Sequence, residues 1–224
     1  MAFATPQFIS TAPPIKRPVP SPQILWPSAL GFSDDGETDL LKFPSLGAIK
    51  ARIGASPPEP LLAFTNAAQN AQDRILILDD FLFKSKDGQA LQSRYDQIMR
   101  WFPDGLVAND IRILTNAHGP KTEHELIRQK FAERAAAINR RSRNRVGNVT
   151  IAINFTLNTE FPYVHDRFAV VDNELWHFGA TVGGLHEALS AATRGWDSDQ
   201  HDAIRFFDDA WRGDARSLGR GRHG

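Results

Sequence analysis

The stretch YVHDRFAVVD (residues 163–172), followed by NELWHFGAT (residues 173–181), decides how this chain is expected to fold. Both halves are rich in apolar and aromatic residues that favour strands, and an Asp-Asn pair at residues 172–173 links them. Such a two-residue link is typical of a tight turn, so the stretch predicts an antiparallel hairpin. Side chains alternate between the two faces of a strand, and we therefore expect His165 and Arg167 on the same face.

The rest of the chain alternates between strand and helix patterns. Compact apolar runs predict three buried strands, at residues 74–83, 111–118 and 148–155. Apolar residues at helical spacing predict helices at residues 61–72, 89–102, 122–143 and 202–211. Strands that alternate with helices indicate an α/β fold, and the hairpin adds antiparallel pairs. The sequence therefore predicts a mixed β-sheet flanked by helices.

Proline content divides the chain into parts. Eleven of the 14 prolines fall within the first 60 of the 224 residues, where they disfavour helices and central strands. We expect a Pro-rich N-terminal arm or linker at residues 1–58, a globular domain at residues 59–213 and a basic, disordered tail at residues 214–224. The apolar residues of the arm, such as Trp26, have two interpretations: they dock on their own domain, or they dock on a partner.

Composition excludes several classes of function. Lysine and arginine balance aspartate and glutamate at 26 each, so any attraction to nucleic acid must come from a local patch. The absence of cysteine excludes disulfides, thiolate nucleophiles and cysteine-based zinc sites. The N-terminus lacks the apolar run of a signal peptide, and no segment reaches the length of a membrane span. We expect a soluble, cytoplasmic protein that needs no metal and no cofactor.

The hairpin carries the residues with the most informative chemistry. Imidazole can act as a nucleophile or a proton shuttle, which makes His165 a candidate catalytic residue. The guanidinium of Arg167 can hold phosphate through two parallel hydrogen bonds. Asp172 is the third candidate, because a carboxylate can fix the tautomer of a catalytic imidazole.

The spacing of these residues resembles the signature of the phospholipase D superfamily, H-x-K-x4-D followed by G-S-x-N. His165, Arg167 and Asp172 stand at the signature spacing, and Gly179 stands at the glycine. The resemblance covers roughly residues 60–212 and implies one half of a phospholipase D-like fold. Members carry two signature copies, in one chain or across a dimer. The single copy here implies a homodimer that completes the site on its twofold axis.

The resemblance also implies a mechanism. In that family one histidine attacks phosphorus to give a phosphohistidine, the other protonates the leaving group, and no metal is needed. This chain departs from the signature, with Arg167 for lysine, Ala180 for serine and Val182 for asparagine. Thr181 and the glycines at 183–184 are candidate replacement donors to substrate. These departures keep two functions open within the family, and a third possibility is an unrelated α/β binding protein in which the motif is accidental.

The first function is a metal-independent phosphodiesterase acting on nucleic acid. The alternative is a non-catalytic module that binds nucleic acid or a protein partner, with the Pro-rich arm as a docking element.

Residues 121–145 hold eight Lys or Arg against three Glu. Four arginines gather at the end of the predicted helix, namely Arg140, Arg141, Arg143 and Arg145. They either complement the helix dipole or contact a phosphate backbone. Asp79 and Asp80, at a strand end, could approach the site, although such residues more often cap the next turn.

Overall fold

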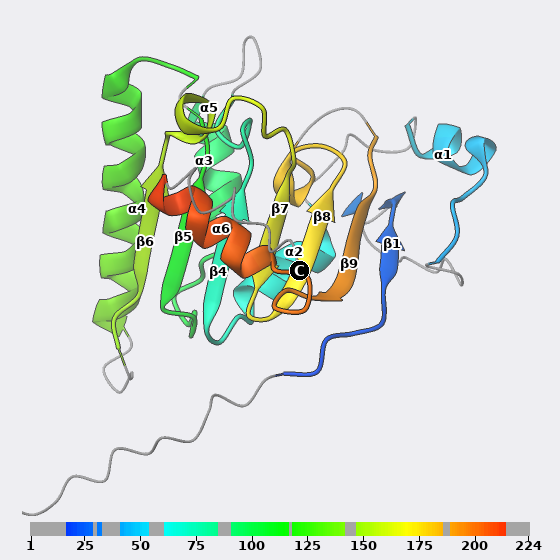
Figure 1. The fold of residues 1–224 in the computed structure, drawn as a ribbon, viewed down its shortest axis with the longest axis horizontal. Coiled ribbons are helices and arrows are strands. Elements are labelled where there is room, and N and C mark those ends of the chain that lie inside the picture. Colours follow the sequence, from blue (N-terminus) through cyan, green and yellow to red (C-terminus); the bar gives the residue numbers. More distant parts are fainter. Residues whose placement is uncertain are drawn as a thin grey trace, which may run out of the picture.

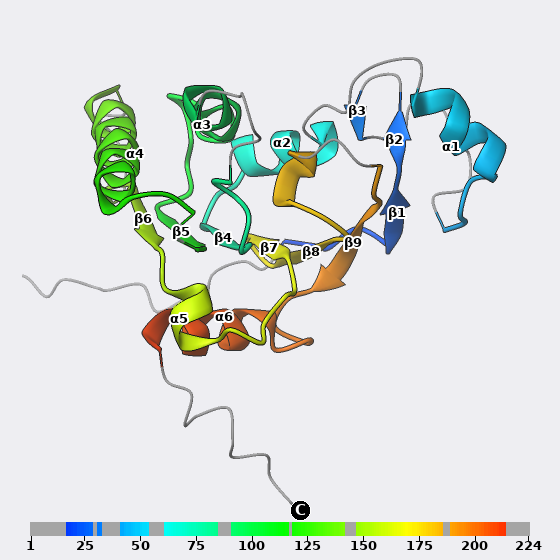
Figure 2. The same cartoon turned by 90° about the horizontal axis from the view of Figure 1, so that it is seen from above.

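The computed structural model describes residues 17–28, 31–32, 41–53, 61–84, 91–116, 118–141, 147–185 and 189–213. These residues form a mixed sheet of seven strands in the order β1-β9-β8-β7-β4-β5-β6, with helices on both faces (Figures 1 and 2). The predicted fold class, a mixed β-sheet flanked by helices, is confirmed.

The strands of the sheet are β1 (Gln23–Leu25), β4 (Arg74–Leu78), β5 (Asp110–Leu114), β6 (Thr150–Asn154), β7 (Phe168–Val171), β8 (Glu174–Phe178) and β9 (Ala192–Asp197), and a separate ribbon consists of β2 (Pro27–Ser28) and β3 (Gly31–Phe32). The helices are α1 (Leu46–Ile53), α2 (Leu62–Gln69), α3 (Leu91–Met99), α4 (Lys121–Arg141), α5 (Leu157–Glu160) and α6 (Ala203–Arg212), with a short 3-10 helix η1 (Val182–Gly184). In the described part of the chain, no helix combines the length and the apolar character that crossing a membrane requires.

The strands β4, β5 and β6 run parallel, whereas β7 lies antiparallel to β4 and β8 lies antiparallel to β7. The predicted hairpin is therefore present, and its turn lies at Asp172, whose φ of 57° is left-handed. Aspartate tolerates this conformation better than most residues, which explains its place in the turn.

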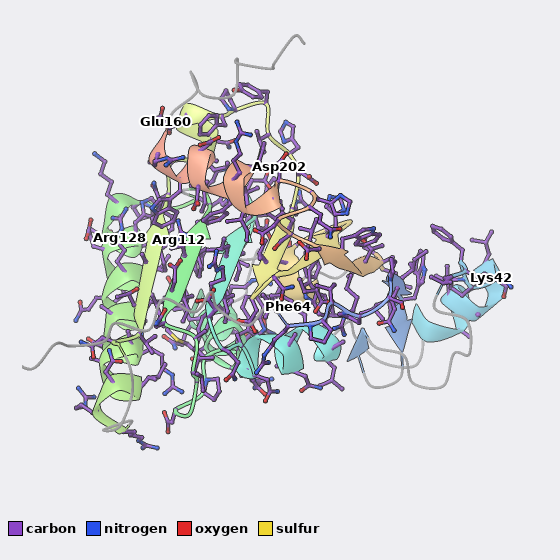
Figure 3. The ribbon with its side chains drawn as sticks, turned by 60° about the horizontal axis from the view of Figure 1, so that its bottom comes forward. Lys42, Phe64, Arg112, Arg128, Glu160 and Asp202 are labelled. Carbon is purple, nitrogen blue, oxygen red and sulfur yellow. The ribbon has the colours of Figure 1, made fainter. Side chains whose placement is uncertain are left out.

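Both faces of the central strands are buried, so these strands read as continuous apolar runs in the sequence. Ile75 and Ile77 of β4 pack in the core on the side of α2, and Leu76 and Leu78 pack on the side of α6. Figure 3 shows Phe64 between α2 and the sheet, where its ring contacts three other aromatic rings, those of Trp101, Trp176 and Phe178. The two packed faces fix the sheet, and with it the positions of the strand ends.

One edge of the sheet collects the ends of several strands. The parallel strands end there at Leu78, Leu114 and Asn154, and β7 begins there at Phe168, which pairs with Leu78. We call this the carboxyl edge, and it lies at the top in Figure 1. Helix α4 starts near the carboxyl edge and ends near the opposite edge (Figure 1). Side chains that follow these strands therefore meet at the carboxyl edge.

The N-terminal part of the chain contributes to the sheet. Strand β1 pairs antiparallel with β9, from Gln23 opposite Arg194 to Leu25 opposite Ala192, and Leu25 is buried. Part of the predicted arm thus docks on its own domain, and the predicted boundary at residue 58 does not separate the arm from the sheet. The basic tail, residues 214–224, lies outside the described residues.

Candidate functional site at the carboxyl edge

His165 and Arg167 meet at the carboxyl edge, in the segment that leads into β7. The side chain of His165 is 75% exposed, and its Nδ1 lies 3.9 Å from Oδ2 of Asp80. The Nε of Arg167 donates a hydrogen bond to Oδ1 of Asp80 at 3.0 Å. The two oxygens of one buried carboxylate therefore face an imidazole and a guanidinium, and the prediction that His165 and Arg167 share a side is consistent with this contact.

A second carboxylate, that of Asp79, lies beneath this pair and is fully buried. It accepts hydrogen bonds from the backbone N–H groups of Phe81 at 2.8 Å and Val182 at 2.7 Å, and it lies 3.7 Å from Nε of Arg167. Burial raises the pKa of Asp79 to about 6, although the two N–H groups and Arg167 oppose that shift. Asp79 thus joins the turn after β4 to the η1 loop, as a capping residue would.

The sequence left two interpretations for Asp79 and Asp80, namely that they cap the next turn or that they approach the site. Each residue fits one of them. Asp79 caps the neighbouring loops, whereas Asp80 contacts the candidate site residues. The signal that pointed to Asp80 was its place directly after a buried strand of an α/β sheet. Its contact with Arg167 spans 87 positions and could not be read from local sequence.

An aromatic ring lies against the same cations. The guanidinium carbon of Arg167 is 4.8 Å from the centroid of the Phe81 ring, a distance typical of a cation–π contact. The ring of His118, just after β5, stacks on Phe81 with centroids 5.2 Å apart and an angle of 15°. The Nε2 of His118 also bonds to the backbone carbonyl of Asp80. Sequence reasoning missed His118, because it appeared only as the end of a predicted strand.

The loop after β8 reaches the carboxyl edge but uses its own polar groups. The N–H of Gly179 donates to the carbonyl of Ala191 at 3.1 Å, and a Cβ at Gly179 would lie 2.3 Å from Oγ of Ser190. Thr181 is buried, and its carbonyl accepts from the N–H of Gly184 at 3.1 Å. Gly179 therefore permits close packing, and its N–H is already bonded to the Ala191 carbonyl. The structure places Thr181 beside Val182, next to the Asp79 carboxylate.

Asp172 lies at the opposite edge of the sheet, because β7 separates it from His165 and Arg167. Its carboxylate accepts hydrogen bonds from the backbone N–H groups of Gln72 at 2.9 Å and Asp73 at 2.8 Å, just before β4. The expectation that Asp172 orients His165 is therefore wrong for two residues of the same chain. Asp172 fastens the hairpin turn to the start of β4, and the carboxylate that faces His165 is Asp80.

The arginines at the end of α4 also lie away from His165. Helix α4 carries Arg140 and Arg141 to the opposite edge of the sheet, where both are exposed and Arg141 forms an ion pair with Asp104. They are not part of the cluster at the carboxyl edge of the same chain, and the two interpretations of these arginines, a complement to the helix dipole or a phosphate-backbone contact, both stay predictions. Arg143 and Arg145 lie outside the described residues.

One further ion pair borders the cluster. His177 of β8 bonds through Nε2 to Oδ1 of Asp166 at 2.5 Å. This bond raises the pKa of His177 and lowers the pKa of Asp166. Asp166 lies between His165 and Arg167 in sequence, so the pair helps to fix the segment that carries both residues.

The exposed imidazole of His165 and the partly exposed guanidinium of Arg167 face outward, while the carboxylates of Asp79 and Asp80 are buried. The Nε of Arg167 is bonded to Asp80, and its Nη atoms have no hydrogen-bond acceptor among the described residues. Over the same residues, no group of three or more His, Cys, Asp or Glu side chains is arranged to hold a metal ion.

No family model matches the chain, and no curated protein matches it. Among solved structures, it is similar to the structure of TrmBL2, an archaeal chromatin protein that shows a novel mode of DNA binding, at 12% identity and a TM-score of 0.38, covering 67% of this chain and 48% of that chain. It is also similar to the phosphatidylserine synthase of Haemophilus influenzae Rd KW20, at 14% identity and a TM-score of 0.41, covering 66% of this chain and 33% of that one. The chain therefore spans less than half of either protein. Similarity at this level says nothing about activity.

Proposed function

We propose that this chain is a metal-independent phosphodiesterase that cleaves nucleic acid through a phosphohistidine intermediate. One observation carries the proposal: the exposed imidazole of His165 and the guanidinium of Arg167 converge on the carboxylate of Asp80. The resemblance of this segment to the phospholipase D signature supports the same chemistry.

In the proposed reaction, His165 attacks phosphorus through Nε2. Its Nδ1–H faces Asp80, which would hold the tautomer and stabilise the imidazolium that forms. A separation of 3.9 Å is long for a hydrogen bond, and catalytic contacts of this kind often shorten when substrate binds. The Nη atoms of Arg167 would hold the phosphoryl oxygens, on which negative charge builds up during attack.

Nucleic acid is the proposed substrate because exposed arginines lie where a long polyanion can reach them. Arg140 and Arg141 stand at the opposite edge of the sheet from His165. Helix α4 has 21 residues and is about 31 Å long, and successive phosphates of one DNA strand lie about 3.4 Å apart along a duplex. A segment of roughly ten nucleotides could therefore reach from Arg140 and Arg141 to the carboxyl edge.

A homodimer is proposed as the working form, because the chain has one signature copy where the family has two. The Pro-rich arm is a proposed docking element for a protein partner. The lack of cysteine suits the reducing cytoplasm, which is the proposed location.

The test is cleavage of labelled single- and double-stranded DNA and RNA in excess chelator. The wild type is compared with His165→Ala and with His201→Ala, which removes an exposed histidine after β9, at the opposite edge. Cleavage by the wild type and His201→Ala, but not by His165→Ala, supports the proposal. Cleavage that stops in chelator, or that persists in His165→Ala, contradicts it.

A specific observation also favours the alternative, a non-catalytic module that binds nucleic acid or a protein. The family's phosphate-binding asparagine is replaced by Val182, whose side chain is fully buried and whose N–H is held by Asp79. For such a module, the wild type would bind labelled nucleic acid without cleaving it, and His165→Ala would bind equally well.

A further inference from the structure

A second imidazole, that of His118, lies in the cluster around Asp80. Its Nε2 bonds to the backbone carbonyl of Asp80, while the side chain of the same residue faces Nδ1 of His165 at 3.9 Å. Two exposed histidines from one chain therefore contact one residue. They reach it from different places in the sequence, one after β5 and one before β7.

The contacts of His118 leave one of its nitrogens available for proton transfer. A carbonyl oxygen only accepts hydrogen bonds, so Nε2 must carry a hydrogen in this arrangement. Nδ1 has no hydrogen-bond partner among the described residues and can gain or lose a proton. A carbonyl that holds one ring nitrogen while the other reacts is a common way of preparing histidine as an acid or base.

The orientation of the His118 ring is fixed by packing as well. It stacks on Phe81, and the guanidinium carbon of Arg167 lies 4.8 Å from the centroid of that ring. Asp80 therefore contacts all three side chains, His118 through its backbone carbonyl and His165 and Arg167 through its carboxylate. A merely structural histidine could make the same stack, so a test must separate proton transfer from packing.

We propose that His118 supplies, within the same chain, the proton donor and acceptor that accompanies attack by His165. This inference rests on the proposed phosphodiesterase function. It differs from the arrangement that the resemblance implies, in which the second histidine comes from the twofold-related copy of the signature.

The reaction has two steps, and protons balance in each. Nε2 of His165 forms a bond to phosphorus, the bond from phosphorus to the leaving oxygen breaks, and Nδ1–H of protonated His118 gives that oxygen its proton. Water then attacks phosphorus and gives a proton to the neutral His118. The phosphorus–nitrogen bond breaks, His165 is restored, and the phosphate monoester leaves.

The test compares two leaving groups in excess chelator. The leaving group of a dinucleotide is a nucleoside alkoxide, which needs a proton. The leaving group of the p-nitrophenyl ester of thymidine 5′-phosphate is p-nitrophenolate, which is stable without one. The variant is His118→Gln, whose amide can still donate to the Asp80 carbonyl but cannot shuttle protons. The matched control is His124→Gln, which replaces a histidine of α4 that stacks on Phe155 with centroids 4.6 Å apart.

We expect His118→Gln to cleave the dinucleotide roughly 10²–10⁴-fold more slowly, the usual contribution of general acid–base catalysis. It should still release about one equivalent of p-nitrophenol per chain in a rapid first turnover and then stall as the phosphohistidine, because water lacks its base. Added imidazole should restore turnover in His118→Ala. His124→Gln should behave as the wild type with both substrates.

Two results would overturn the inference, and a third would refute the proposed function on which it rests. Unchanged cleavage of both substrates by His118→Gln would assign the second proton to another group, such as the partner's copy of the site. An equal slowing of both substrates, without a burst or imidazole rescue, would assign His118 a packing role. A wild type that cleaves neither the four nucleic acids nor the two small substrates would instead refute the phosphodiesterase proposal itself.

Discussion

The Nε of Arg167 donates a hydrogen bond to Oδ1 of Asp80 across 3.0 Å, and this contact joins the end of β4 to the start of β7. The Asp80 side chain is 3% exposed and that of Arg167 is 22% exposed. Asp79, 3.7 Å from the same nitrogen, is fully buried. One guanidinium thus compensates two buried carboxylates, so it has a structural role in addition to its proposed role with phosphate.

Removing Arg167 should therefore destabilise the fold. Arg167→Ala leaves Asp79 and Asp80 buried without their cation, and we expect the free energy of unfolding to fall by about 3 kcal/mol, as for a broken buried ion pair. Urea unfolding at pH 7 measures this loss. The urea concentration at the midpoint should fall, while the dependence of the unfolding free energy on urea concentration should stay the same. Arg205→Ala, on the exposed side of α6, is the control and should change little. An Arg167→Ala midpoint equal to that of the control would show that the pair adds no net stability.

Replacing Asp172 should lower stability but not the cleavage rate, and replacing His165 should do the reverse. Asp172→Ala removes acceptors for the backbone N–H groups of Gln72 and Asp73, and we expect a loss of roughly 2 kcal/mol in unfolding free energy. Its cleavage rate at a temperature where it stays folded should match the wild type. His165→Ala should lose cleavage and keep its stability, because the side chain is 75% exposed. Asp172→Asn is the matched control, since asparagine tolerates a φ of 57° and keeps one acceptor oxygen. If Asp172→Ala abolished cleavage while folded, Asp172 would act in the site after all.

The buried acid Asp79 should make stability depend on pH. Because burial raises its pKa from 3.8 to about 6, the folded state favours the protonated form. The contribution of protonated Asp79 to the free energy of unfolding is complete below pH 3.8. It is lost as the pH rises through about 6. At about 1.36 kcal/mol per pKa unit, the loss amounts to roughly 3 kcal/mol.

Urea unfolding of the wild type and Asp79→Asn at pH 4 and pH 7 tests this expectation, because other carboxylates cancel in the difference. The wild type should lose stability relative to Asp79→Asn on going from pH 4 to pH 7. A difference independent of pH would mean that Asp79 titrates in the folded protein as it does in the unfolded chain.

Gly195 should control how β1 joins the sheet. Its φ is +96°, and a Cβ there would lie 2.6 Å from the carbonyl oxygen of Ser21 and 2.7 Å from Cα of Pro22. Gly195→Ala should push this backbone away and open the pairing of Gln23–Leu25 with β9. Hydrogen exchange of the β1 amides should become at least tenfold faster. Gly105→Ala is the control, because nothing lies within 4 Å of the position that its Cβ would take, and unchanged exchange in Gly195→Ala would contradict the argument.

The parts of the fold that local pattern encodes were predictable from the sequence. The hairpin followed from alternation around an Asp-Asn turn, and the parallel strands β4, β5 and β6 followed from compact apolar runs. Strand β9 was missed, because residues 192–197, ATRGWD, are polar and contain the glycine that lets β1 approach. Strand β1 was missed because the surrounding prolines indicated an extended arm rather than an edge strand.

The site was only partly predictable, for a geometric reason. His165 and Arg167 were found from their spacing, but Asp172 was assigned to them although seven extended residues span about 23 Å. The residues that do join them, Asp80 and His118, come from the ends of other strands. Their contacts depend on the order of strands in the sheet, which local sequence does not specify.

Strand β1 also has a consequence for association between chains. Without it, β9 would present a row of unpaired N–H and C=O groups, which is a template for pairing with other molecules. Strand β1 covers that row with only three residues, between Pro22 and Pro27, so its own outer side offers little to a further strand. The proline-rich N-terminal segment thus ends the growth of the sheet, and a chain shortened past Leu25 would be prone to aggregate.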